Sequence, residues 1–212
     1  MAKNFDLSSL FQSVTNQLTD QKESLNEADT YNHDHGDHMV DIFNLVQKAV
    51  SKKTNKPVAE QLEYASKVVE KEGHSGSSKL YAQGLASAAK NFSGADLNQD
   101  NIGLLVKSLL NAEKLKPKPK AQGAGGLLGS LLSGLTGQTN TSEKEEEQEL
   151  DMDDLIKAGL AFYQSKQEGD SNSEAMIGAL MAASPLGQTD HRKQSGSIVA
   201  STIMNFAKSF MN

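Results

Sequence analysis

Apolar residues recur along most of this chain at steps of three and four positions, the spacing that places side chains on one face of an α-helix. The first such face comprises Phe5, Leu7, Leu10, Phe11, Val14 and Leu18, and the second Met39, Ile42, Phe43, Val46 and Val50. A third helix is predicted to have Pro57 at its first helical position and to be closed by Gly73, since proline is common at helix starts and glycine just past helix ends.

Further helices are predicted near residues 78–91, 98–115, 153–167, 173–183 and 196–211. No alternating Val/Ile/Thr-rich run bounded by turns is present, so a sheet is not expected. The pattern therefore predicts an all-α fold of amphipathic helices in a single domain, residues 1–212.

Residues 116–150 interrupt the helical pattern. The run Lys116-Pro-Lys-Pro-Lys120 cannot continue a helix, because proline has no amide donor and clashes with the preceding turn. A Gly/Leu-rich segment, 121–137, and an acidic run, 142–149, follow. We interpret the stretch as a flexible insertion with a loosely docked hydrophobic helix; the alternative is a mobile lid or a segment that touches a lipid or a partner.

Charge and composition exclude several classes of protein. A net charge of −6 over 212 residues argues against nucleic-acid binding, which requires a basic surface. The absence of cysteine excludes disulfides and Cys-zinc sites and fits a reducing compartment. The N-terminus lacks the apolar stretch of a secretory signal, and no run approaches eighteen apolar residues. We therefore expect a cytoplasmic protein without a membrane span.

Residues 29–38, Asp-Thr-Tyr-Asn-His-Asp-His-Gly-Asp-His, hold three carboxylates and three of the five histidines. Carboxylates this close repel one another unless a cation, a basic partner or protons offset their charge. The flanking sequences look helical, which places the cluster at a helix–helix junction. Asp29, Asp34 and Asp37 offer the oxygen ligands that Mg2+ prefers.

Two alternatives remain open for this cluster. His33, His35 and His38 make a Zn2+ or Mn2+ site with hydrolytic activity a rival, although no HExxH helix is present. The cluster also fits a helix-capping turn, in which Asp34 or Asp37 caps a helix that starts near His38.

Two further polar loops precede predicted helices. In residues 72–78, small residues open a helix, whose free amides and dipole favour an anion; a plain helix cap is the alternative. In residues 184–196, Asp190, His191, Arg192 and Lys193 are candidates to bind or position a phosphate group, with a solvated turn as the alternative.

In this order and at these separations, the three loops resemble the nucleotide-binding domain of the dihydroxyacetone kinase family, the DhaL-type or Dak phosphatase domain. The family's D-x(4)-D-x-D-H-G-x-N-M corresponds to Asp29 followed by Asp34-His35-Gly36-Asp37-His38-Met39. Its G-G-A-S-G-x-L-Y-G resembles Gly73-His-Ser-Gly-Ser-Ser-Lys-Leu-Tyr-Ala82, and its late G-x-x-D resembles Gly187-Gln-Thr-Asp190.

The resemblance implies about eight antiparallel helices in a closed barrel, with ADP or ATP and Mg2+ held by loops at one end. It implies a metal site formed by Asp29, Asp34 and Asp37, and a nucleotide site formed by His35, Gly36, Ser75, Gly76, Gly187, Asp190 and Arg192. It further implies kinase chemistry, phosphoryl transfer in which a separate subunit or domain carries the substrate.

The chain also departs from the family pattern. The acidic loop is shorter, and His38 replaces an asparagine. The segment G-x-[KR]-T-M-x-D, which the family carries in the middle of its sequence, is missing. These departures support an alternative, a catalytically degenerate relative that serves as a regulatory module or binds a lipid or other apolar ligand. Residues Gly125–Leu135, within the Gly/Leu segment 123–137, would then gate the ligand.

Overall fold

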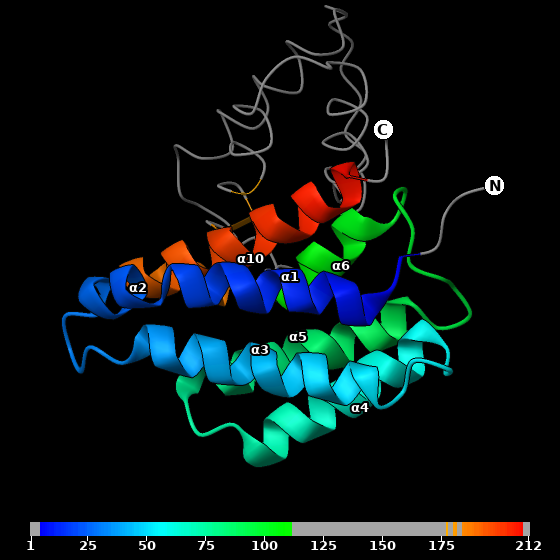
Figure 1. The fold of residues 1–212 in the computed structure, drawn as a ribbon, viewed down its shortest axis with the longest axis horizontal. Helices are drawn as coiled ribbons and strands as arrows, with labels where there is room; N and C mark the ends of the chain where they lie inside the picture. The colour runs from blue at the N-terminus through cyan, green and yellow to red at the C-terminus, as the bar shows by residue number, and fades with distance from the viewer. Residues whose placement is uncertain (1–4, 112–176, 178–179, 182–183, 210–212) are drawn as a thin grey trace, which may run out of the picture.

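The computed structural model describes residues 5–111, 177, 180, 181 and 184–209 (Figure 1). These residues form seven α-helices and one 3-10 helix and contain no strand, which confirms the predicted all-α class for the described part of the chain. The elements are α1 (Leu7–Asp20), α2 (Lys22–Ala28), α3 (His35–Ser51), α4 (Val58–Glu72), α5 (Gly76–Asn91), α6 (Ile102–Leu109), the 3-10 helix η2 (Pro185–Gln188) and α10 (Asp190–Lys208).

The predicted insertion 116–150, the predicted helix 153–167 and most of 173–183 lie outside the described residues. Among the described helices, α3 packs between α1 and α4. Helix α4 also packs against α5, and α5 packs against α6. Helix α10 lies along α1 and antiparallel to it (Figure 1). The closed barrel stays a prediction, because it depends on residues outside the described part.

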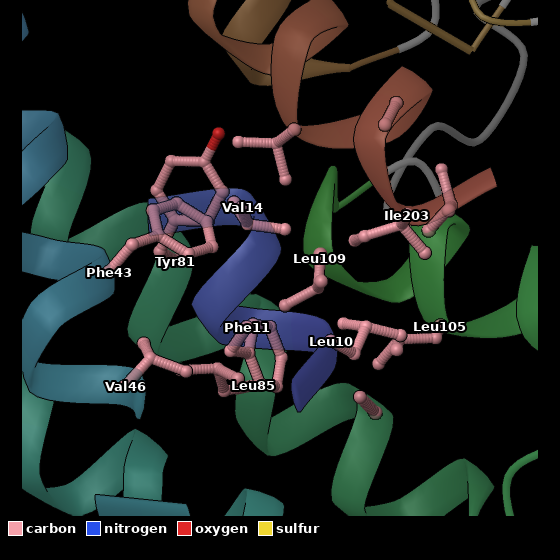
Figure 2. Close-up of a cluster of buried hydrophobic side chains, with 14 of the residues drawn as sticks. Leu10, Phe11, Val14, Phe43, Val46, Tyr81, Leu85, Leu105, Leu109 and Ile203 are labelled. Carbon is pink, nitrogen blue, oxygen red and sulfur yellow. The ribbon is translucent and has the colours of Figure 1, made fainter. Parts of the chain in front are cut away.

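The core forms where the predicted apolar faces meet (Figure 2). Phe11 of α1 and Phe43 of α3 pack with ring centroids 6.2 Å apart, and Phe43 meets Tyr81 of α5 edge-to-face at 5.0 Å. Leu105 and Leu109 of α6 and Ile203 of α10 complete this cluster. Burial of these side chains supplies the main stabilisation of the fold, as apolar surface leaves water.

Several helix ends differ from the predicted ones, by up to six residues, whereas α5 ends at Asn91 as predicted. Pro57 is the N-cap of α4 rather than its first helical residue. Gly73 does end α4, but with an extended φ of −84°. Glycine is needed there for space, since a β-carbon would lie 2.4 Å from Cβ of Ser78. Helix α10 begins at Asp190, so the polar residues predicted as a loop form its first turn.

No helix in the described ranges is long and apolar enough to cross a lipid bilayer.

Candidate functional site at the polar end of the bundle

The junction between α2 and α3 is organised by Asn26, a residue of α2. Its Oδ1 accepts hydrogen bonds from the backbone N–H of Gly36 at 2.7 Å and of Asp37 at 3.3 Å, and its Nδ2 donates to Asp37 Oδ2 at 2.9 Å. Asp34 occupies the N-cap position of α3 but makes no capping hydrogen bond with its side chain. The capping hydrogen bonds of α3 thus come from another helix: Asp34 has the N-cap position that the capping alternative gave it, but neither its side chain nor that of Asp37 caps the helix.

Gly36 allows α2 and α3 to approach each other closely. A β-carbon at this position would lie 2.1 Å from the backbone oxygen of Lys22 and 2.8 Å from Oδ1 of Asn26. The backbone of Lys22 cannot move aside as a flexible side chain can, so a larger residue at position 36 would force α2 and α3 apart. Gly36, predicted as a nucleotide contact, has a packing role in this structure.

Asp37 and Asp34 both have internal partners at this junction. Asp37 lies 3.1 Å from Nζ of Lys22, and the hydrogen bonds from Asn26 and Lys22 hold the pKa of Asp37 below its usual value. Asp34 Oδ1 accepts from Nδ2 of Asn32 at 2.6 Å and lies 3.2 Å from Nδ1 of His38. Both carboxylates are thus engaged within their own junction.

Asp29 is buried, with 4% of its surface exposed. Its Oδ1 accepts from the backbone N–H of Tyr31 at 3.2 Å and lies 3.8 Å from Nδ1 of His191 in α10. Burial is the largest influence on the pKa of Asp29 and raises it, but the Tyr31 hydrogen bond and the nearby histidines outweigh that effect and leave the pKa lowered. The buried carboxylate therefore remains charged at neutral pH and faces the start of α10.

His35 links the first turn of α3 to α10. Its Nε2 lies 2.9 Å from Oγ of Ser195, and the Ser195 hydroxyl donates to the carbonyl of Arg192 at 3.1 Å. That hydroxyl has one proton, so it must accept from an Nε2–H of His35. Burial, assisted by the neighbouring His191 ring at 4.6 Å, lowers the pKa of His35 to about 4. His35 is thus neutral at pH 7 and positions α10.

Arg192 brings the third loop to the same place. A β-carbon on Gly76, the first residue of α5, would lie 2.9 Å from Nη2 of Arg192, so the guanidinium rests against the start of that helix. Nε of Arg192 is buried and has no hydrogen-bond partner in the described part of the chain. Ser75 caps α5 by a reciprocal pair of hydrogen bonds with Ser78, while helix geometry leaves the amides of Gly76 and Ser77 without an intrahelical acceptor.

The structure thus brings together residues from all three predicted loops, with the contacts Asp29–His191, His35–Ser195 and Gly76–Arg192. These loops share one end of the bundle, here called the polar end, at the left in Figure 1. Gly187 lies within η2, where its amide donates to the carbonyl of Ser184 at 2.9 Å, and Asp190 is exposed at the start of α10. Across residues 5–111 and 184–209, no hydrogen bond or ion pair joins Gly187 or Asp190 to the other predicted site residues.

The fit of magnesium to these carboxylates can be judged from the geometry. No group of three His, Cys, Asp or Glu side chains that could hold a metal ion occurs among the residues the structure describes. Asp29, Asp34 and Asp37 each face a different internal partner, so they do not fit a shared three-carboxylate site in this arrangement. The metal site therefore stays a prediction from the sequence, and no chemical step is assigned to it.

Sequence reasoning missed Asn26, Lys22 and Ser195. Asn26 and Lys22 lie in α2, before the acidic cluster, and carry no motif. Ser195 lies one turn after Asp190, on the buried face of α10. The only sequence signal for these three residues was the high density of polar residues on both sides of the junction between α2 and α3.

Comparisons with protein-family models, with curated proteins and with solved structures gave no match to this protein.

Proposed function

We propose that the polar end of the bundle binds the phosphate groups of a nucleotide, ADP or ATP. The observation that supports this is the position of the Arg192 guanidinium against Gly76, where α5 begins. Arginine presents a fork of donors that matches phosphate oxygens, and the N-terminus of a helix offers free amides and a favourable dipole. Neither element alone identifies a ligand, but together they place donors of two kinds, guanidinium and backbone amide, at one position.

The other residues of this end hold Arg192 in place. The Ser195 hydroxyl donates to the Arg192 carbonyl and accepts from His35, which fixes the first turn of α10 against α3. Asp29 lies beside the ring of His191, the residue before Arg192. These contacts supply the preorganisation that a binding site requires, because they restrict the backbone that carries Arg192.

The family resemblance extends the proposal to chemistry. In the kinase form of the proposal, the protein is the nucleotide-binding part of a kinase. Phosphoryl transfer then needs a separate subunit or domain that carries the substrate. The resemblance also makes Mg2+ the cation to test first, ahead of Zn2+ or Mn2+. The arrangement of the aspartates gives the metal no support, so the proposal rests on Arg192 and α5.

A second candidate is a catalytically degenerate relative that binds its ligand without turnover. The engagement of Asp37 by Lys22 and Asn26 favours it, because this carboxylate would have to leave both partners to reach a cation. The lipid-binding form of this alternative depends on segment 123–137, which lies outside the described residues.

Titration calorimetry of the full-length protein with ADP and with ATP, each with and without Mg2+, tests the proposal. We expect binding that Arg192→Ala weakens by roughly tenfold or more, the effect of removing a charged hydrogen-bond donor. Lys193→Ala is the matched control, since it removes the same charge from the next, exposed position of α10. Magnesium-dependent binding supports the kinase form and magnesium-independent binding the degenerate form. The absence of nucleotide binding in every condition overturns both.

A further inference from the structure

Tyr31 stands out on the surface of the polar end. Its side chain is 93% exposed, and no other large hydrophobic side chain in the described part of the chain is exposed. Tyrosine normally covers its ring against apolar neighbours and leaves only the hydroxyl in water. A fully exposed ring therefore offers both of its faces to a ligand.

The backbone of Tyr31 is attached to the same residues that hold the start of α10. Its N–H donates to Asp29 Oδ1 at 3.2 Å, and that oxygen lies 3.8 Å from Nδ1 of His191. His191 in turn precedes Arg192, the proposed phosphate ligand. The backbone that carries the exposed ring is thus linked through Asp29 and His191 to the turn of α10 that carries Arg192.

The rest of this loop restricts the backbone on either side of Tyr31. His33 adopts a left-handed φ of 56°, with its Nδ1 3.3 Å from the carbonyl oxygen of Asn26. Asn32 Nδ2 donates to Asp34. A loop held on both sides of Tyr31 loses little conformational entropy when a ligand binds, which favours contact by an exposed aromatic ring.

We propose that Tyr31 is a stacking surface for the base of the bound nucleotide. The inference rests on the proposed function, since it needs phosphates held at Arg192 and α5. It deepens that proposal by assigning the residue that contacts the base, which the phosphate contacts alone do not identify. Stacking uses the π-face that every base has, so the site should accept different bases with similar affinity.

The experiment compares ADP with pyrophosphate on the full-length protein by titration calorimetry. Pyrophosphate carries the phosphate contacts without the base. We expect Tyr31→Ala to weaken ADP binding about tenfold, as loss of one aromatic–base stack does, and to leave pyrophosphate binding unchanged. Tyr31→Phe should bind ADP like the wild type, because the ring is retained. GDP should bind the wild type with an affinity close to that of ADP.

Tyr64→Ala is the matched control, since this ring lies in α4 beneath Nζ of Lys53, which follows the C-terminal end of α3. It should leave both affinities unchanged. If pyrophosphate and ADP both fail to bind the wild type, the proposed function itself fails. If both bind the wild type but Tyr31→Ala binds ADP normally, or loses both ligands equally, the phosphate site stands and the stacking role of Tyr31 is overturned.

Discussion

His35 Nε2 donates to Oγ of Ser195 across 2.9 Å, although 160 positions separate the two residues in the sequence. Both side chains are buried, so neither can exchange this partner for water. The bond joins the first turn of α3 to α10 and thereby fixes where Arg192 lies. The stability of the polar end and the geometry of the proposed phosphate site thus depend on the same contact.

Ser195→Ala should destabilise the protein by about 1–3 kcal/mol, because it leaves the buried N–H of His35 without an acceptor. Urea denaturation followed by circular dichroism measures the change. Ser201→Ala is a close control, since the Ser201 hydroxyl also donates to the carbonyl three residues earlier in α10 but has no partner on another helix among the described residues. If the two variants lost the same free energy of unfolding, the hydrogen bond to His35 would add nothing to the contribution that a serine makes within α10.

Stability should fall as the pH is lowered from about 6.5 to 4. Burial lowers the pKa of His35 to about 4 from the 6.5 of an unperturbed histidine. Between these values the unfolded protein takes up a proton that the folded protein excludes, so acid favours unfolding. A shift of this size corresponds to at most about 3 kcal/mol.

The matched variants for this pH dependence are His35→Gln and His74→Gln. Glutamine at position 35 retains a donor for Ser195 but does not titrate, so the loss of stability between pH 6.5 and 5 should shrink. His74→Gln is the control because it makes the same substitution at an exposed position between α4 and α5. The lowered pKa values of Asp29 and Asp37 act at more acidic pH, so they do not obscure this window. Identical profiles in the wild type and His35→Gln would contradict the assignment.

Gly36→Ala should destabilise the protein by about 1–3 kcal/mol or more, the range for overpacking a tightly packed site. The new methyl group would meet the backbone oxygen of Lys22, which cannot move without shifting α2. Gly76→Ala is the informative comparison, because its methyl group meets only the guanidinium of Arg192, the far end of a long side chain rather than backbone. Gly76→Ala should fold normally yet bind nucleotide more weakly, whereas a stable Gly36→Ala would refute the close approach of α2 and α3.

The helices were predictable because their signal is local. Leu10 and Val14, or Met39 and Phe43, reveal a buried face through spacing alone, and each of these side chains is buried. The start of α10 was misplaced because Asp190 and Lys193 are exposed and polar, so no apolar spacing marks the first turn. The cap from Asn26 was not predictable, since it depends on how α2 docks against α3. The same holds for Lys22, whose partner lies on another helix.

Asp37→Asn distinguishes a structural role of this residue from a metal-binding one. The pair that Asp37 forms with Lys22 is partly exposed, and such pairs contribute about 0–1 kcal/mol, so the stability loss should be small. Asparagine can still accept from Asn26, and α3 should keep its cap. If Asp37 only joins α2 to α3, the affinity for ADP in the presence of Mg2+ stays within about twofold of the wild type. Lys22→Ala, which removes the other half of the pair, should behave in the same way. A large loss of magnesium-dependent binding in Asp37→Asn alone, with the fold intact, would instead identify Asp37 as a metal ligand and remove the observation that favours the degenerate alternative.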